Sequence, residues 1–93
     1  MELAPFDPAE YLDDDDAAAA YLSEALESND AAFVADALGV VARARGMTRL
    51  ARETGLSRES LYKSLSANGN PEFATVLKIL RALGLRLRVS ARG

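Results

Sequence analysis

The apolar residues of this chain recur mostly every three or four positions, which is the spacing of one face of an α-helix. Two segments show this spacing most clearly. The apolar positions that we expect to face the core are Tyr21, Leu22, Ala25 and Leu26 in the first segment and Phe33, Val34, Ala37, Leu38 and Val41 in the second. Together with the residues that start and stop helices, the pattern predicts five helices, over residues 14–28, 30–44, 48–54, 58–66 and 71–83.

Helix boundaries are expected where capping side chains and glycines stand. The predicted caps are Asp30, Thr48, Ser57 and Asn70, and the predicted helix ends are Gly46, Gly55 and Gly84. Pro71 suits the first position of the last helix, because its missing N–H is not needed there. The run Asp7-Pro8-Ala9-Glu10 predicts one short helical turn over residues 8–12, with Asp7 as its cap.

After Gly84 the spacing changes from helical to alternating. Three apolar residues alternate with three polar ones in "LRLRVS", residues 85–90, and this pattern predicts a short β-strand. A lone strand leaves its backbone groups without partners. Its partner could be the N-terminal stretch around residues 3–6, a second copy of the chain, or a strand of another protein.

The chain is short and has an uneven charge distribution. Its 93 residues, 49% of them hydrophobic, are enough for one small domain with a modest core. Residues 1–42 contain eleven acidic residues and no basic one, whereas residues 43–93 contain all eleven basic residues and three acidic ones. The domain therefore divides into acidic N-terminal helices over 1–42, a basic core over 43–84 and a C-terminal strand and tail over 85–93. Such a division indicates two faces with two kinds of partner.

The missing residue types exclude most catalytic and metal-binding chemistry. The chain has no histidine and no cysteine, so it lacks the usual general base and the commonest ligands of transition metals. It has no glycine loop that could cradle a phosphate and no recognisable nucleophile. Four adjacent aspartates, residues 13–16, point around a helix and cannot converge on one ion. We therefore expect no enzyme, no cofactor and no metal site.

Nothing in the sequence indicates a membrane or an export signal. No run of 18 apolar residues is present, and the acidic N-terminus does not resemble a signal peptide. We expect a cytoplasmic protein.

Residues 50–66, "LARETGLSRESLYKSLS", have the pattern of a helix-turn-helix. Ala51 is the small residue where the two helices cross, and Gly55 occupies the turn. The expected core residues are Leu50, Leu56, Leu61 and Leu65. Thr54 and Ser64 stand where such motifs more usually have aliphatic residues. The alternative interpretation of this pattern is an ordinary helical hairpin in a bundle.

Two longer stretches resemble a known family. "ARARGMTRLARETGLSRESLYKSLSANGNPEFATVLKILRALGLRL" and "FDPAEYLDDDDAAAAYLSEALESND" are similar to the antidote proteins of chromosomal addiction modules, HigA-like antitoxins in the Cro/C1-type class of phage-repressor-like proteins. With the patterns above, the resemblance predicts an all-α fold, a compact five-helix bundle with a lambda-repressor-like helix-turn-helix and a short C-terminal β-strand. It implies a cytoplasmic antitoxin that binds a basic RelE/ParE-type toxin and represses its own operon by binding the promoter.

The fourth predicted helix would then read DNA. Its outward positions are the candidates for contacts with bases: Arg58, Glu59, Tyr62 and Lys63. An arginine or lysine donates hydrogen bonds to guanine, and a glutamate accepts one from cytosine. The candidates for contacts with phosphates are Thr48, Arg49, Ser57 and Ser60, since hydroxyls, basic groups and free amides at helix starts suit a phosphate.

The acidic half offers candidates for binding the toxin. These are Asp13, Asp14, Asp15, Asp16, Glu24 and Glu27. Their carboxylates would complement a basic surface and speed its capture. One monomer makes few phosphate contacts, so we expect a homodimer on a two-fold operator. The competing hypothesis is a module that binds only proteins and does not bind DNA.

Overall fold

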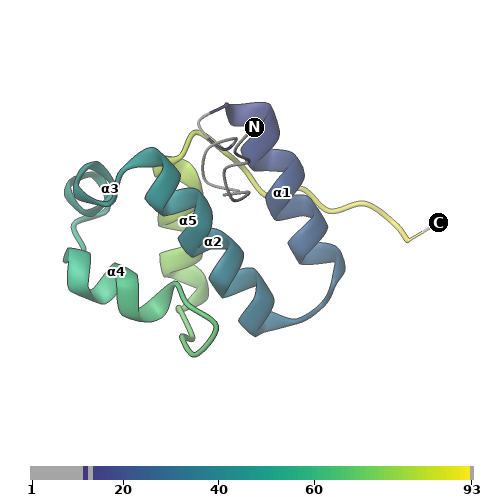
Figure 1. Ribbon diagram of the computed structural model, residues 1–93. Helices are drawn as coiled ribbons and strands as arrows, with labels where there is room; N and C mark the ends of the chain where they lie inside the picture. The colour runs from purple at the N-terminus through teal and green to yellow at the C-terminus, as the bar shows by residue number, and fades with distance from the viewer. Residues whose placement is uncertain (1–11, 13, 93) are drawn as a thin grey trace, which may run out of the picture.

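The computed structural model describes residue 12 and residues 14–92 and has five α-helices in that part of the chain. They are α1 (Asp15–Glu27), α2 (Ala31–Arg45), α3 (Met47–Thr54), α4 (Arg58–Ser64) and α5 (Phe73–Ala82). The all-α prediction is confirmed. In Figure 1, α1 and α2 lie side by side as an antiparallel pair, α3 and α4 form the opposite end of the molecule, and α5 lies behind α2. The predicted turn over residues 8–12 and the N-terminal stretch around residues 3–6 lie outside the described residues, apart from Leu12.

Three helices begin at side-chain caps. The carboxylate of Asp14 accepts a hydrogen bond from the amide of Asp16 at 2.7 Å, and that of Asp30 accepts one from Ala32 at 3.0 Å. The hydroxyl of Ser57 accepts one from the amide of Ser60 at 3.0 Å. These bonds satisfy amide groups that the first turn of a helix leaves without partners. The predicted caps Asp30 and Ser57 are therefore confirmed.

Two other predicted caps are wrong. Thr48 lies inside the first turn of α3, and the cap position belongs to Gly46, which has no side chain to offer. Asn70 and Pro71 lie before α5, because Glu72 keeps an extended backbone (φ −61°, ψ 149°) and the helix begins at Phe73. A helix cannot include residues on the far side of an extended residue.

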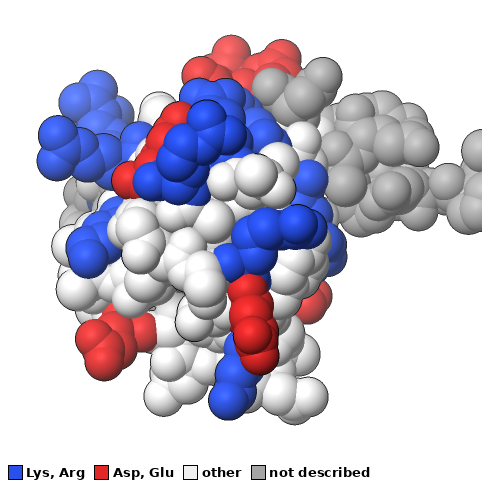
Figure 2. Space-filling model, turned by 90° about the vertical axis from the view of Figure 1, so that its left-hand side faces the viewer, with Lys and Arg blue, Asp and Glu red and all other residues white. Residues whose placement is uncertain are grey.

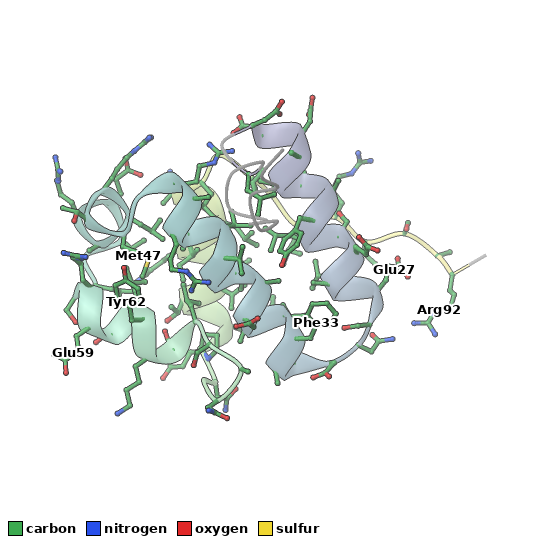
Figure 3. All side chains as sticks on the ribbon, viewed as in Figure 1. Glu27, Phe33, Met47, Glu59, Tyr62 and Arg92 are labelled. Atoms are coloured by element: carbon green, nitrogen blue, oxygen red, sulfur yellow. The ribbon has the colours of Figure 1, made fainter. Side chains whose placement is uncertain are left out.

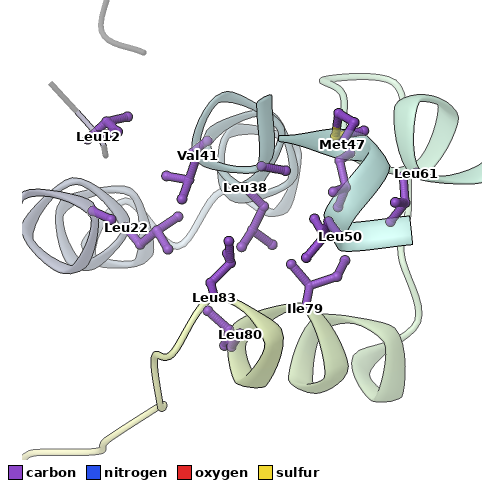
Figure 4. Packing of buried hydrophobic residues seen from close by; sticks show 14 of the residues in the cluster. Leu12, Leu22, Leu38, Val41, Met47, Leu50, Leu61, Ile79, Leu80 and Leu83 are labelled. Carbon is purple, nitrogen blue, oxygen red and sulfur yellow. The ribbon is translucent and has the colours of Figure 1, made fainter. Parts of the chain in front are cut away.

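The core lies where α1, α2, α3, α4 and α5 meet. The largest fully buried side chains are Leu38, Leu61, Leu65, Ile79 and Val41, and Figure 4 shows most of them converging between the helices. Removing a leucine from water contributes about 1.5–3 kcal/mol, so these residues account for much of the stability. Two residues that we expected to face inward do not. Leu26 and Phe33 are 42% and 48% exposed.

Gly39 sets the distance between α2 and the end of α4. A Cβ atom at this position would lie 2.1 Å from the carbonyl oxygen of Leu65, far inside van der Waals contact. Only glycine therefore lets α4 end directly against α2. This contact fixes the position of α4 on the body of the protein.

The predicted strand over residues 85–90 is not formed in this part of the chain. The structure has no strand among its described residues, and residues 85–92 extend away from the end of α5 past α1 (Figure 1). A strand requires a second backbone beside it, and the described helices leave none available. No helix among residues 14–92 is long and apolar enough to cross a bilayer.

Candidate nucleic-acid interface

The segment from α3 to α4 consists of two short helices joined by a tight turn, as the sequence predicts. Gly55 takes a left-handed conformation (φ 74°) directly after α3, and three residues separate the two helices. Leu61 on α4 is completely buried against the core, and Leu56 is partly buried at the corner. The two helices are thus held against the body, and the opposite side of α4 faces solvent.

Thr54 stabilises this turn. Its hydroxyl donates a hydrogen bond to the carbonyl of Leu50 at 2.8 Å and accepts one from the amide of Leu56 at 3.3 Å. The side chain therefore joins the last turn of α3 to the segment that leads into α4. A threonine at a position that usually has an aliphatic residue has a clear structural use here. Ser64 instead bonds back to the carbonyl of Ser60 at 2.9 Å.

All four candidates for base contacts lie on the exposed side of α4. They are Arg58, Glu59, Tyr62 and Lys63. The guanidinium of Arg58 lies 5.9 Å from the centre of the Tyr62 ring, close enough for a cation–π contact. In Figure 3, Glu59 points away from the rest of the molecule. The arrangement presents an arginine near an aromatic ring, a carboxylate and a lysine along one exposed helix face.

The candidates for phosphate contacts also reach the surface, but three of the four already have side-chain partners. Arg49 on α3 forms an ion pair with Glu53 at 2.9 Å, one turn further along the helix. The hydrogen bond from Arg49 to Glu53 and the charge of Glu53 raise the pKa of Arg49 above its usual value. The hydroxyl of Ser57 donates a hydrogen bond to that of Ser60 at 2.9 Å. Thr48 is exposed in the first turn of α3.

Basic residues gather on the side of the molecule formed by α3 and α4. Figure 2 shows this side, with several lysine and arginine side chains and fewer acidic ones. Part of the group surrounds a hollow near the start of α3 and the end of α5, to which Arg45, Arg49 and Arg81 contribute. Asp15 and Glu53 line the same hollow, and each forms an ion pair with one of these arginines, Arg45 and Arg49 respectively.

The acidic candidates are not equally available. Asp14 caps α1. Asp15 forms an ion pair with Arg45, whose side chain also donates a hydrogen bond to the carbonyl of Leu12 at 3.0 Å. Asp16, Glu24 and Glu27 are exposed, and Asp13 lies outside the described residues. The exposed acids of α1 thus remain as the surface that could meet a basic protein.

Sequence reasoning missed three features around this site. The pair Arg49–Glu53 has the spacing i, i+4, which could have predicted it. The pair Arg45–Asp15 joins residues thirty positions apart, so no local pattern predicts it. An apolar groove of about 330 Å³ between the end of α1 and the start of α5 was also missed. It is lined by Leu26 and Phe73, which helical spacing would assign to the core, and by Leu87 of the C-terminal segment.

The fold and the two charged surfaces define a small all-α protein with an acidic α1 and a basic side formed by α3 and α4. The chain belongs to a family of probable addiction module antidote proteins, whose family model matches residues 2–91. It is therefore an antitoxin by family, and the partner of such an antidote is a toxin.

A related protein comes from Haemophilus influenzae and is described only as an uncharacterized protein. It is 47% identical to this chain over 88 residues, which covers 95% of this chain and 91% of the relative. No solved structure matches the chain.

Proposed function

We propose that the chain is the antitoxin of a type II toxin–antitoxin module that neutralises a RelE/ParE-type toxin by direct binding. We further propose that it represses its own operon as a homodimeric, sequence-specific DNA-binding protein of the Cro/C1 type. In this proposal the protein acts by binding the toxin and the operator DNA and catalyses no reaction. Membership of the antidote family supports the first part, and the α3–α4 segment supports the second.

The exposed face of α4 is the observation on which DNA binding depends. Because Leu61 is buried, the opposite face of α4 carries Arg58 and Lys63 outward. A cation–π contact with Tyr62 restricts the Arg58 side chain before any DNA arrives, which would lower the entropy lost when it binds a guanine.

The start of α3 suits the DNA backbone. Gly46 at its cap position provides no side-chain acceptor, so the first amide groups of α3 remain available to a phosphate oxygen. Thr48 and Arg49 stand exposed beside them. In this arrangement α3 crosses the backbone while α4 enters the major groove.

The exposed acids of α1 are the proposed toxin surface. Asp16, Glu24 and Glu27 lie on a different helix from the basic residues of α3 and α4. Complementary charge would speed the encounter with a basic toxin and favour the correct orientation. The toxin and the DNA would therefore bind different sides of the antitoxin.

Mobility shift on the DNA upstream of the gene tests DNA binding, at two salt concentrations and against a scrambled duplex. We expect specific binding that weakens steeply with salt, because bound phosphates release counterions. The Arg58→Ala and Lys63→Ala variants should each bind at least about tenfold more weakly. Arg92→Ala removes the same charge from the exposed C-terminal segment and is the matched control, with little expected loss.

Two results would contradict the DNA-binding proposal. One is a lack of binding by the parent protein even at low salt. The other is equal loss in the α4 variants and in the Arg92 control, which would mean that only total charge matters. The first result favours the competing hypothesis of a module that binds only proteins, and the second rules out α4 as the helix that reads DNA.

A further inference from the structure

The turn between α3 and α4 is held by one hydroxyl group, that of Thr54. This group donates a hydrogen bond to the carbonyl of Leu50 at 2.8 Å and a longer one to the carbonyl of Ala51 at 3.4 Å. It also accepts a hydrogen bond from the amide of Leu56 at 3.3 Å. Thr54 is the last residue of α3 and Leu56 lies between the helices, so one side chain connects the end of α3 to the segment that begins α4.

The amide of Leu56 depends on this hydroxyl. The amide of Gly55 bonds to the carbonyl of Ala51 at 3.0 Å, but the amide of Leu56 has no backbone partner in the described part of the chain. Leu56 is partly buried against the core. An amide in such a place is costly to leave unpaired. Without the Thr54 hydroxyl, the turn would have to shift until the Leu56 amide reached water.

The far end of α4 is held by a different contact. Gly39 lets the carbonyl of Leu65 lie against α2, and Leu61 is fully buried between the two ends. If the turn shifts, α4 pivots about its far end, and the displacement is largest at Arg58, the first residue of α4. A helix of this length spans about 10 Å, so a tilt of roughly 10° moves its near end by about 2 Å. That exceeds the roughly 0.5 Å range of hydrogen-bond lengths.

Thr54 differs from a hydroxyl that only bonds back to its own helix. Serines and threonines commonly bond to the carbonyl one turn earlier, and Ser64 on α4 does this with Ser60 at 2.9 Å. Ser64 accepts no hydrogen bond from another described residue, whereas Thr54 accepts one from beyond the end of its helix. The bond to Leu56 therefore gives Thr54 an effect outside α3.

We propose that Thr54 is a positioning residue for DNA recognition, because its hydroxyl fixes the direction of α4 and thereby the place of Arg58 against a base. This inference rests on the DNA-binding part of the proposed function, but its first step, the fixed direction of α4, involves no DNA. A hydroxyl can donate and accept at the same time. Valine has the shape of threonine without either ability, and serine keeps both.

Nuclear magnetic resonance of the purified protein tests the first step. In Thr54→Val we expect the amide of Leu56 to exchange with solvent about tenfold faster, since it loses its partner. The residual dipolar couplings of the α4 amides should also change relative to those of α5. Thr54→Ser should match the parent in both measurements. Thr75→Val on α5 is the matched control, because the Thr75 side chain forms no hydrogen bond to a described residue.

Mobility shift tests the second step and separates positioning from a general loss of folded protein. Thr54→Val changes no charge, so binding to a scrambled duplex should stay within about twofold of the parent, because it depends on the phosphates that are neutralised. Binding to the operator should weaken by about tenfold, because base contacts need exact placement. A smaller folded fraction would instead weaken both equally. Thr54→Ser should restore operator binding to within about twofold of the parent.

Three results would overturn the proposal. Parent-like exchange of the Leu56 amide in Thr54→Val would mean that the hydroxyl does not hold the turn. Unchanged dipolar couplings would mean that other contacts set the direction of α4. Equal losses on the operator and on the scrambled duplex would indicate a loss of folding. If the parent itself binds no operator, the proposed function fails instead, and the two measurements without DNA still decide whether Thr54 fixes α4.

Discussion

At Arg49, a neighbouring carboxylate competes with the DNA phosphate that we propose as the ligand of this side chain. Its partner Glu53 is part-exposed on the same face of α3 and holds the guanidinium at 2.9 Å. A phosphate would have to displace that carboxylate and approach its negative charge. Exposed pairs of this kind contribute only about 0.2–1 kcal/mol, so the competition is modest in size but acts at the binding surface.

We therefore expect Glu53→Gln to bind operator DNA about two- to fivefold more tightly than the parent, from the same range of pair energies. The gain should be largest at low salt, where charge repulsion is least screened. Mobility shift at two salt concentrations measures it. Glu27→Gln makes the same change of charge on α1 and is the control. A gain of equal size in the control would mean that total charge, and not the release of Arg49, is responsible.

Gly39 has no side chain, and its small size allows the end of α4 to lie directly against α2. Alanine is the better helix former by roughly 0.5–1 kcal/mol, so propensity alone predicts that Gly39→Ala stabilises α2. The steric argument predicts the reverse, because the new Cβ would meet the carbonyl of Leu65 at 2.1 Å. That oxygen belongs to backbone at the end of α4 and cannot move without shifting α4.

We expect Gly39→Ala to lower the free energy of unfolding by about 1–3 kcal/mol, the usual cost of overpacking. Thermal or urea unfolding followed by circular dichroism measures this loss. Ser23→Ala on the exposed side of α1 is the control, since it gains helix propensity without any close contact and should not destabilise. An unchanged or higher stability of Gly39→Ala would show that α4 does not depend on this approach.

At the scale of elements, the sequence predicts those features that depend on neighbours in the chain. Asp30 and Ser57 cap their helices as predicted, because each cap bond joins residues two or three positions apart. The exposed face of α4 follows in the same way from the burial of Leu61. The existence of all five helices, and most of their bounds, were therefore accessible from the spacing of apolar residues together with the capping residues.

The errors arise where tertiary structure decides. The start of α5 is set by the extended backbone at Glu72, which the favourable local sequence at Asn70 and Pro71 does not reveal. Leu26 has helical spacing but lines a surface groove and not the core. The strand over 85–90 has a strong alternating pattern but lacks a second strand among the described residues. In each case the local sequence pattern was present, but the tertiary structure around it could not be predicted from the sequence.

At the scale of the whole molecule, one ion pair among the described residues joins the acidic and the basic parts of the chain. Arg45 at the end of α2 binds Asp15 at the start of α1, and it also donates to the carbonyl of Leu12. The acidic helix is thereby fixed to the body that carries α3 and α4. The exposed acids of α1 and the exposed face of α4 thus belong to different elements and need not be covered by the same ligand.

This separation predicts that toxin and operator bind at the same time. Reversing charge on α1, with Glu24→Lys and Glu27→Lys together, should slow association with the cognate toxin by about tenfold at low salt, since steering depends on complementary charge. The same variant should bind DNA at least as tightly as the parent. Arg58→Ala should do the reverse, with weaker DNA binding and unchanged capture of toxin.

Stopped-flow association and mobility shift measure the two effects, and size-exclusion chromatography of antitoxin, toxin and operator should give one ternary peak. Toxin that releases the operator from the parent protein would mean that the two surfaces overlap, and the assignment of α1 to the toxin would then be wrong.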